Sequence, residues 1–350
     1  MATVNYHDQK NKENATKLRE IISELPKFCK DFFRGIEPTT SSLTRIAYAY
    51  DLRVFFQFLH NNNPTLKQTP IQDLKVEMLD DIKAIDIEEY LEYLTYYKKG
   101  DTEYLNNETG KKRKLISLRS FYNYYFKKEM IFTNPAALVN IPKLHTKEII
   151  RLDIDEVAKM LDGVESGENM TASQKKFHNK TRVRDLAIVT VLLGTGIRVS
   201  ECVGLDIDDV DFNNDGLKIR RKGGSESIIY FGDEVRDALE EYLREREQVI
   251  PCTGSEEALF LSLQKKRISV KAIENLVRKY SELVTKLKRI TPHKLRSTYG
   301  TSLYRETGDI YLVADVLGHK DVNTTKKHYA AIEDSRRRSA ANKVKLREKE

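Results

Sequence analysis

A proline-punctuated stretch near the middle of the chain constrains the fold more than any other feature. "TNPAALVNIPKLHTKEII", residues 133–150, places Pro135 and Pro142 in a segment without sustained apolar periodicity, which is typical of a linker between domains. Helical patterns precede this stretch, whereas helical and strand-like patterns are mixed after it. Because 350 residues also exceed the size of one typical core, the sequence predicts two domains with a boundary at about residues 140–150.

The first half of the chain predicts a compact bundle of helices. Residues 41–62, 86–100 and 114–131 each carry apolar side chains every three or four positions, the period of an amphipathic helix. Ser41 or Ser42 is suited to cap the first of these helices, and Gly100 to end the second. The apolar positions of the first helix are Leu43, Ile46, Tyr50, Val54 and Phe58.

The second half predicts a mixture of helices and a small sheet. A helix is expected to begin near Asp153. Residues 182–196 form a nearly all-apolar pattern, so we expect a buried helix that breaks at Gly194 and Gly196. In residues 217–231, two short strand-like runs flank a Gly-Gly pair, which predicts a β-hairpin.

The charge balance bears on the kind of partner. Lys and Arg number 60 against 53 Asp and Glu, a net charge of +7. This excess favours a polyanionic partner, although many soluble proteins carry a similar charge without one. Basic side chains gather at residues 111–114, 220–222 and 335–338, and each run fits either a solvated surface or a contact with DNA.

The cysteines and the start of the chain bear on location. Cys29, Cys202 and Cys252 have neither metal-ligand nor C-x-x-C spacing, so reduced thiols are expected. Residues 1–20 are polar and lack the apolar segment of a secretory signal. No apolar run approaches the roughly 20 residues of a membrane helix. We therefore expect a cytoplasmic protein that makes no contact with membranes.

A His and an Arg spaced three apart follow a helix-starting pair in "TPHKLRSTYG", residues 291–300. Thr291 is suited to cap the helix and Pro292 to its first position, so His293 and Arg296 share a face in the opening turns. Such a face is either an ordinary polar surface or a phosphate site. The second is plausible because the orphan N–H groups and the helix dipole favour an anion there.

Further chemistry-bearing residues lie on either side of this helix. Arg198 follows the "GTG" break, and Glu201 lies three residues on, where a helix would let it hold the guanidinium. Lys222 falls at the tip of the predicted hairpin. His319 follows a helix-ending Gly in "VLGHKD", and Tyr329 comes ten residues later. Taken singly, each also has a plain structural reading, such as a packed Tyr, a solvated Lys or a His⁺ at a helix C-terminus.

The order of these motifs is more specific than any one of them. G-x-R-x-x-E, a hairpin Lys, H-x-x-R, L-G-H and a Tyr follow one another from about residue 184 to 332. This series resembles the tyrosine recombinase, or phage integrase, superfamily, and the helical first half is similar to that family's core-binding domain. The resemblance implies a mainly α fold with a small β-sheet, in which a SAM-like helical core-binding domain precedes an α+β catalytic domain.

The implied domain limits combine the motifs with the linker. Residues 1–30 are expected to be an N-terminal extension, either helical or disordered. The core-binding domain then takes residues 31–142, the linker 143–152 and the catalytic domain 153–335. The basic tail at 336–350 is either a helix that docks on a neighbouring protomer or a frayed, solvated end.

The resemblance also implies a mechanism. Attack on phosphorus adds negative charge to the phosphate oxygens, and two arginines are suited to bind that charge bidentately. Tyr329 would be the nucleophile that forms a 3′-phosphotyrosyl bond, and Lys222 would protonate the departing 5′ oxygen. The histidines would donate hydrogen bonds or accept the phenol proton. No metal and no cofactor is implied. The implied catalytic set is Arg198, Lys222, His293, Arg296, His319 and Tyr329, with Glu201 in support.

The implied function is site-specific recombination of double-stranded DNA through a Holliday junction. The expected assembly is a homo-tetramer on two recombination sites, from a protein that is a monomer or weak dimer when free, and accessory proteins are compatible with it. The alternatives are a type IB topoisomerase, a telomere resolvase, or a DNA-binding relative that has lost the reaction. The last would be expected to lack an Arg or the Tyr, and this chain has them all.

Two positions depart from the family pattern. Ser297 follows the second arginine, where many relatives carry a His. The gap from His319 to Tyr329 is one residue longer than in Cre-like and Xer-like members, and the form T-x-x-x-Y at Thr325 to Tyr329 favours the mobile-element branch. Integration, excision, resolution of chromosome dimers and inversion all use the same chemistry, so the biological role stays open.

Overall fold

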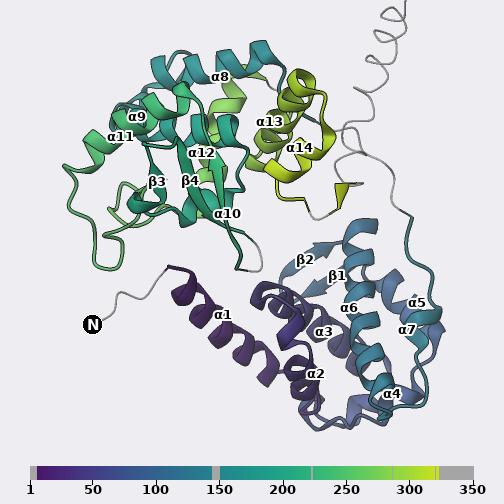
Figure 1. The fold of residues 1–350 in the computed structure, drawn as a ribbon. Helices are drawn as coiled ribbons and strands as arrows, with labels where there is room; N and C mark the ends of the chain where they lie inside the picture. Colours follow the sequence, from purple (N-terminus) through teal and green to yellow (C-terminus); the bar gives the residue numbers. More distant parts are fainter. Residues whose placement is uncertain (1–5, 144–149, 222–223, 286, 320, 323–350) are drawn as a thin grey trace, which may run out of the picture. The chain divides into compact units, whose positions relative to one another are not determined.

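The computed structural model describes residues 6–143, 150–221, 224–285, 287–319 and 321–322 (Figure 1). The chain forms two compact units, residues 1–147 and 148–350. The linker expected at 143–152 falls mostly outside the described residues, so the predicted domain limits stay a prediction.

The first unit is a bundle of helices with one hairpin. Its core is rich in aromatic rings that meet edge to face, such as Phe32 on Phe121 at 5.2 Å and Phe121 on Tyr125 at 5.0 Å between centroids. Such contacts add to the area that each ring buries. The elements are α1 (Tyr6–Ser23), α2 (Cys29–Gly35), α3 (Ser42–Asn62), α4 (Met78–Asp81), α5 (Ala84–Tyr93), β1 (Tyr96–Lys99), β2 (Thr102–Leu105), α6 (Glu108–Lys127) and α7 (Pro135–Leu138).

Helix α3 begins where the sequence predicts. Ser41 is the capping residue, because its side chain accepts a hydrogen bond from the backbone N–H of Thr44 at 3.2 Å. The predicted burial of the apolar face is confirmed for Ile46 and Phe58 but is wrong for Leu43, which is 66% exposed. The core side of α3 therefore starts one turn later than the pattern suggests.

The segment predicted to stay helical up to Gly100 changes to a strand instead. Helix α5 ends at Tyr93, and β1 pairs antiparallel with β2 so that Tyr97 faces Tyr104. The rings of Tyr97 and Tyr104 stack with centroids 5.0 Å apart, and Tyr93 stacks on Tyr97 at 5.2 Å. Gly100 forms the hairpin turn at a φ of +57°.

The start of the chain belongs to this unit. Of the two forms expected for residues 1–30, the described part is helical, and α1 packs along α3. Ile21 near the end of α1, Leu25 just after it and Cys29 in α2 are buried in the core.

The second unit surrounds one long helix. Helix α9 contacts α8, α10, α11, α12 and α13, and this contact on all sides explains why its second half is nearly all apolar. It starts ten residues before the expected position, and Gly194 does not break it. Only Gly196, with a φ of +63°, ends it. The helices are α8 (Ile154–Ser166), α9 (Ala172–Thr195), α10 (Val199–Gly204), α11 (Asp233–Arg246), α12 (Val270–Val284), α13 (Pro292–Thr307) and α14 (Ile310–Val316).

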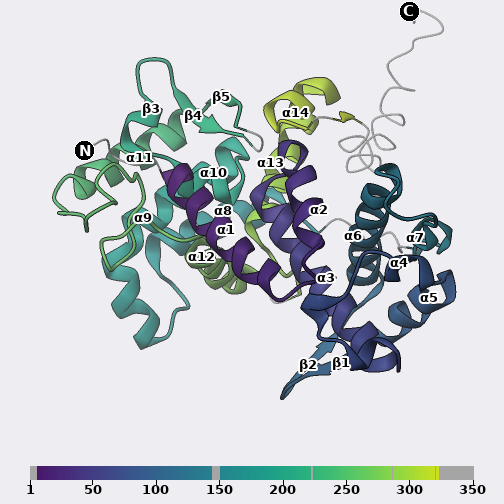
Figure 2. The ribbon, with the colours of Figure 1, turned by 90° about the horizontal axis from the view of Figure 1, so that it is seen from below.

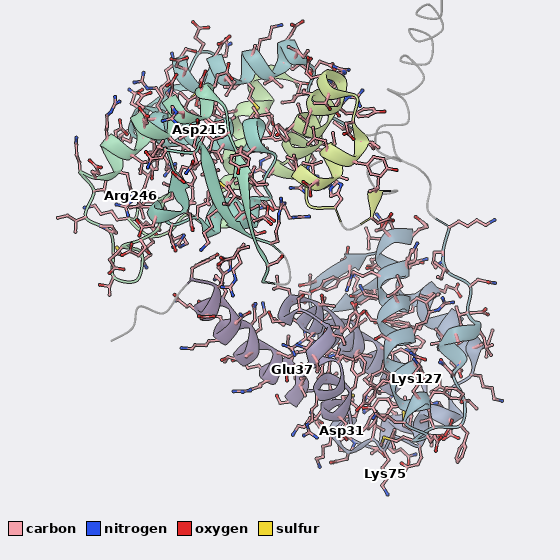
Figure 3. The ribbon with its side chains drawn as sticks, viewed as in Figure 1. Asp31, Glu37, Lys75, Lys127, Asp215 and Arg246 are labelled. Carbon is pink, nitrogen blue, oxygen red and sulfur yellow. The ribbon has the colours of Figure 1, made fainter. Side chains whose placement is uncertain are left out.

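The predicted hairpin is part of a three-stranded antiparallel sheet in the order β3-β4-β5 (Figure 2). Strands β4 (Gly216–Arg220) and β5 (Glu226–Tyr230) are the two predicted runs, whereas β3 (Val210–Asp211) is not among the predicted elements. Helix α11 follows the sheet, and Arg246 near its end, labelled in Figure 3, donates hydrogen bonds to carbonyls of residues 249, 256 and 258. The mainly α fold with a small β-sheet is confirmed.

Within the part of the chain that the structure describes, no helix combines the length and apolar character needed to span a membrane.

Candidate active site

The end of helix α14 provides the frame of the candidate site. Gly318 adopts a φ of +58°, so the chain turns back and two backbone N–H groups reach helical carbonyls. Gly318 donates to Asp315 and His319 donates to Ala314, each at 2.8 Å. This pair of hydrogen bonds is the Schellman motif that ends many helices at a Gly. The carbonyls of residues 316–318 come next, and they need partners from outside the helix.

Three guanidinium groups supply those partners. Arg221 donates to the carbonyls of residues 316 and 317 at 2.9 and 3.2 Å. Arg296 donates to the carbonyl of residue 317, and Arg198 to that of residue 318 at 3.4 Å. The negative end of the helix dipole favours cations at this position. We call Arg198, Arg221 and Arg296 the arginine cluster.

Glu201 holds Arg198 from the other side. Arg198 caps helix α10, and the Glu201 carboxylate accepts its backbone N–H at 2.7 Å and its Nη1 at 2.8 Å. The Glu201 side chain is only 3% exposed, whereas that of Arg198 is 35% exposed. This is the contact that the three-residue spacing predicts, and it leaves the guanidinium fixed in direction yet open to solvent.

Arg296 is anchored more deeply. It is 4% exposed, and its Nη1 donates to the carbonyl of Gly196 at 2.6 Å. This bond ties helix α13 to the break between α9 and α10, two residues before Arg198. Two arginines that lie 98 positions apart in the sequence, Arg198 and Arg296, thus meet at one helix end.

One histidine lies close to Arg296 in the chain, and the other directly follows Gly318, whose carbonyl accepts from Arg198. His293 is exposed in the first turn of α13, one turn before Arg296, and the backbone N–H of His319 closes the motif that ends α14. Pro292 occupies the first turn as expected. Thr291 is the N-cap residue, but its side chain makes no capping hydrogen bond, so that detail of the prediction is wrong.

Lys222, Tyr329 and the tail at 336–350 lie outside the described residues. Their predicted roles are therefore carried forward as proposals.

Arg221 is the residue of this site that sequence reasoning misses, because in the sequence it is only one member of the basic run 220–222. Burial lowers the pKa of the Arg221 guanidinium, with the nearby Glu201 carboxylate opposing that effect and the Arg198 cation adding to it. A signal is present in strand β4, where burial alternates and Ile219 points inward. Two residues on, the same alternation turns Arg221 inward.

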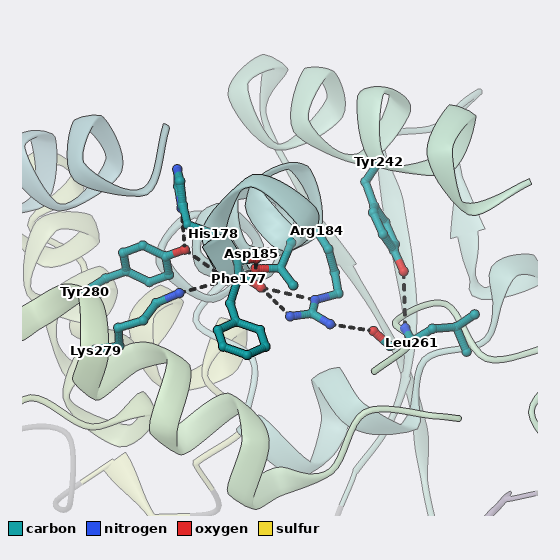
Figure 4. Close-up of polar contacts among 9 residues, drawn as sticks. Phe177, His178, Arg184, Asp185, Tyr242, Leu261, Lys279 and Tyr280 are labelled. Carbon is teal, nitrogen blue, oxygen red and sulfur yellow. Dashed lines mark hydrogen bonds and ion pairs between the residues drawn. The ribbon is translucent and has the colours of Figure 1, made fainter. Parts of the chain in front are cut away.

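A second buried polar network centres on Asp185 (Figure 4). The Asp185 carboxylate, 1% exposed, accepts from Arg184 at 2.6 Å, from Tyr280 at 2.9 Å and from Lys279 at 3.3 Å. The Tyr280 hydroxyl also lies 3.2 Å from Nδ1 of His178. From the sequence, His178 is expected to be an ordinary surface or satisfied residue. It is buried and hydrogen-bonded, and this network joins α9 to α12.

The basic run at 111–114 is partly internal. Arg113 pairs through both terminal nitrogens with the carboxylate of Asp51, which is 2% exposed. Lys114 is 7% exposed and donates to Asn106 at 3.1 Å. Two of the four cations in this run therefore serve the fold of the first unit, which weakens the interpretation of the whole run as a DNA contact.

Cys29, Cys202 and Cys252 are free thiols. In the described ranges, no group of three or more His, Cys, Asp or Glu side chains is arranged to hold a metal ion.

Sequence comparisons identify the family. Residues 151–336 match the phage integrase family. The chain is 34% identical over 311 residues to tyrosine recombinase XerC of Caldanaerobacter subterraneus subsp. tengcongensis, covering 86% of this chain and 81% of the relative. It is 28% identical over 349 residues to tyrosine recombinase XerS of Lactococcus lactis subsp. cremoris, covering 93% and 96%. These relatives are Xer enzymes, and the mobile-element branch that the longer gap before Tyr329 favours stays a prediction.

Structural comparisons find the same fold. XerH bound to its difH substrate superposes with a TM-score of 0.62 at 23% identity, covering 84% of this chain and 79% of that one. A λ integrase dimer bound to a COC′ core site gives 0.60 at 17% identity, covering 86% and 93%. Family match, relatives and site together lead to one conclusion: the chain belongs to the phage integrase family and is a site-specific tyrosine recombinase.

Proposed function

We propose that Arg198 and Arg296, with His293 and His319, form the binding site for the scissile phosphate of double-stranded DNA. The observation that carries this proposal is the convergence of Arg198 and Arg296 on the carbonyls that end α14, directly before His319. A phosphate between these groups would meet planar donors that stay charged at any working pH.

The proposed reaction is a transesterification. The Tyr329 oxygen bonds to phosphorus while the bond from phosphorus to the 5′ oxygen breaks, which leaves a 3′-phosphotyrosyl link. The phenol proton passes to His293 or His319, and the Lys222 ammonium gives a proton to the departing 5′ oxygen. Attack by the 5′ hydroxyl of a second strand reverses these steps and rejoins the DNA.

The described contacts favour catalysis over mere anchoring. Negative charge on the phosphate grows at the transition state, and donors that are already fixed need no reorganisation to meet it. Glu201 and the carbonyls at the ends of α9 and α14 hold Arg198 and Arg296 in place. Arg198 is the more exposed of the two, so we assign it the more direct phosphate contact.

The proposed partners follow from the same chemistry. The similar structures of XerH and λ integrase were solved on DNA, which supports double-stranded DNA as the partner here. We further propose a homo-tetramer that joins two recombination sites through a Holliday junction, acts in the cytoplasm, and forms from a monomer or weak dimer. The tail at 336–350 is proposed to dock on the neighbouring protomer.

Replacement of Tyr329 by Phe tests the function directly. Tyr329→Phe keeps the ring but removes the attacking oxygen, so it should bind target DNA with unchanged affinity and form no covalent adduct. The assay is a nicked suicide substrate run on a denaturing gel. Tyr311→Phe is the matched control, because Tyr311 is 71% exposed in the same unit, and it should form adduct at the wild-type rate. Adduct formation by Tyr329→Phe would rule out this nucleophile.

A further inference from the structure

Arg221 connects two parts of the candidate site. Its guanidinium donates from Nη2 to the carbonyl of Val316 at 2.9 Å and from Nη1 to that of Leu317 at 3.2 Å. Its Nη1 also lies 4.0 Å from the Glu201 carboxylate, the group that orients Arg198. One side chain at the end of β4 therefore shares its partners with both other members of the arginine cluster.

These contacts make Arg221 less available to a phosphate than Arg198 is. Both terminal nitrogens are engaged with carbonyls, and the side chain is 10% exposed, against 35% for Arg198. The guanidinium also packs on Gly318, where an added Cβ would lie 2.7 Å from its Cζ. We therefore consider Arg221 a positioning residue, distinct from the residues that touch the substrate.

The backbone of Arg221 closes the hairpin that carries Lys222. The N–H of Arg221 donates to the carbonyl of Ser225 at 2.8 Å, and its carbonyl accepts from Gly224 at 3.0 Å. Lys222 is the next residue in the chain, so Arg221 is the described residue that directly precedes it. The side chain of Arg221 donates hydrogen bonds to the carbonyls of the turn that precedes His319.

We propose that Arg221 positions Lys222 for proton transfer by fastening the hairpin to the end of α14. This inference rests on the proposed function, in which the bond from phosphorus to the 5′ oxygen breaks and that oxygen takes a proton from the Lys222 ammonium. Without the guanidinium bridge, the hairpin end is no longer fixed relative to the turn before His319. The protonated leaving group then forms less often, although the phosphate remains bound by Arg198 and Arg296.

The test compares two leaving groups in the full-length protein. Arg221→Lys and Arg221→Gln are assayed in single-turnover cleavage of a suicide substrate with the ordinary 5′ oxygen, and of one with sulfur at that bridging position. Sulfur departs as a thiolate and needs no proton, so a defect in proton delivery disappears. We expect both variants, like Lys222→Ala, to cleave the oxygen substrate on the order of 10- to 100-fold more slowly, and the sulfur substrate within about threefold of wild type.

Arg246→Lys is the matched control. Arg246 is also a buried guanidinium, 5% exposed, that donates to backbone carbonyls of residues 249, 256 and 258. Figure 3 shows it at the opposite side of the second unit from α13 and α14. Its replacement should lower the melting temperature without changing the cleavage rate of the folded protein on either substrate.

The possible outcomes distinguish a failure of the Arg221 role from a failure of the proposed function. Equal losses on the oxygen and sulfur substrates, or no loss on either, would overturn the positioning role of Arg221. If the wild-type protein forms no adduct with either substrate, the proposed function itself fails. Adduct formation by the wild type, with a defect in Arg221→Lys that sulfur rescues, supports both.

Discussion

The positive φ of Gly196, +63°, allows α9 to end where its carbonyl can accept the guanidinium of Arg296. An Ala there would strain the backbone, and its Cβ would lie 2.4 Å from the ring of Tyr299. We expect Gly196→Ala to lower the free energy of unfolding by about 2–4 kcal/mol and to slow cleavage, because Arg296 loses its anchor. Denaturant unfolding and the suicide-substrate assay measure the two effects.

A control at a second glycine distinguishes the cost of the positive φ from the cost of the contact with Tyr299. Gly254 also has a positive φ, +83°, but nothing lies within 4 Å of an added Cβ. Gly254→Ala should therefore show the backbone cost alone and keep the wild-type cleavage rate. Equal losses of stability in the two variants would mean that the contact with Tyr299 does not matter.

The basic run at 111–114 makes a different prediction at the residue scale. Among the described residues, Arg113→Ala leaves the buried Asp51 carboxylate with the hydroxyl of Ser117 and the more distant ammonium of Lys114, 3.8 Å away. We expect a loss of about 2–3 kcal/mol in the free energy of unfolding, measured by denaturant titration. Lys112→Ala removes a charge from the same run and should change stability by less than about 0.5 kcal/mol. A similar small effect for Arg113→Ala would show that the pair contributes little.

At the scale of elements, the network around Asp185 joins α9 to α12 and makes stability depend on pH. Burial lowers the pKa of His178 below its ordinary value of 6.5; the Lys279 cation adds to this effect and Asp185 opposes it. Below pH 6.5, His178 is therefore protonated more readily in the unfolded chain than in the folded chain. The contribution of His178 is therefore complete above pH 6.5 and lost as the pH falls.

The pH dependence can be isolated with one variant. The free energy of unfolding is measured at about pH 7.5 and about pH 5.5 for wild type and for His178→Gln. The wild type should lose more stability on acidification than the variant, because the other titrating groups are common to both. Equal losses of stability in the two proteins would show that His178 does not cause the pH dependence.

The elements also show how far sequence reasoning reaches. Local patterns predict α3, α6 and the β4–β5 hairpin, because each signal lies within one short window. The β1–β2 hairpin is not predicted, because the residues before Gly100 also fit a helical pattern. The strand is favoured by stacking of Tyr97 on Tyr104, which lies on the other side of the turn. The spacing predicts the contact of Glu201 with Arg198. Spacing cannot predict the hydrogen bonds from Arg221 to the carbonyls of Val316 and Leu317. These residues are distant in the sequence, and only the tertiary fold brings them together.

At the scale of the whole molecule, the predicted catalytic residues from Arg198 to Tyr329 all belong to the second unit. The order of their motifs along the sequence is enough to indicate the family, because the chemistry needs the same side chains in any such enzyme. The similarity to XerC extends over 86% of the chain, so it reaches well into the first unit. The cleavage proposed here is assigned to residues of the second unit.

The central claim is that one phenol oxygen, that of Tyr329, becomes bonded to DNA. The most direct measurement is to trap the covalent complex on a suicide substrate, digest it with trypsin and nuclease, and locate the modified tyrosine by mass spectrometry. The chain offers 18 tyrosines. We predict a 3′-phosphoryl nucleotide on the peptide of residues 328–336, at Tyr329. The same nucleotide on any other tyrosine would contradict the proposed mechanism.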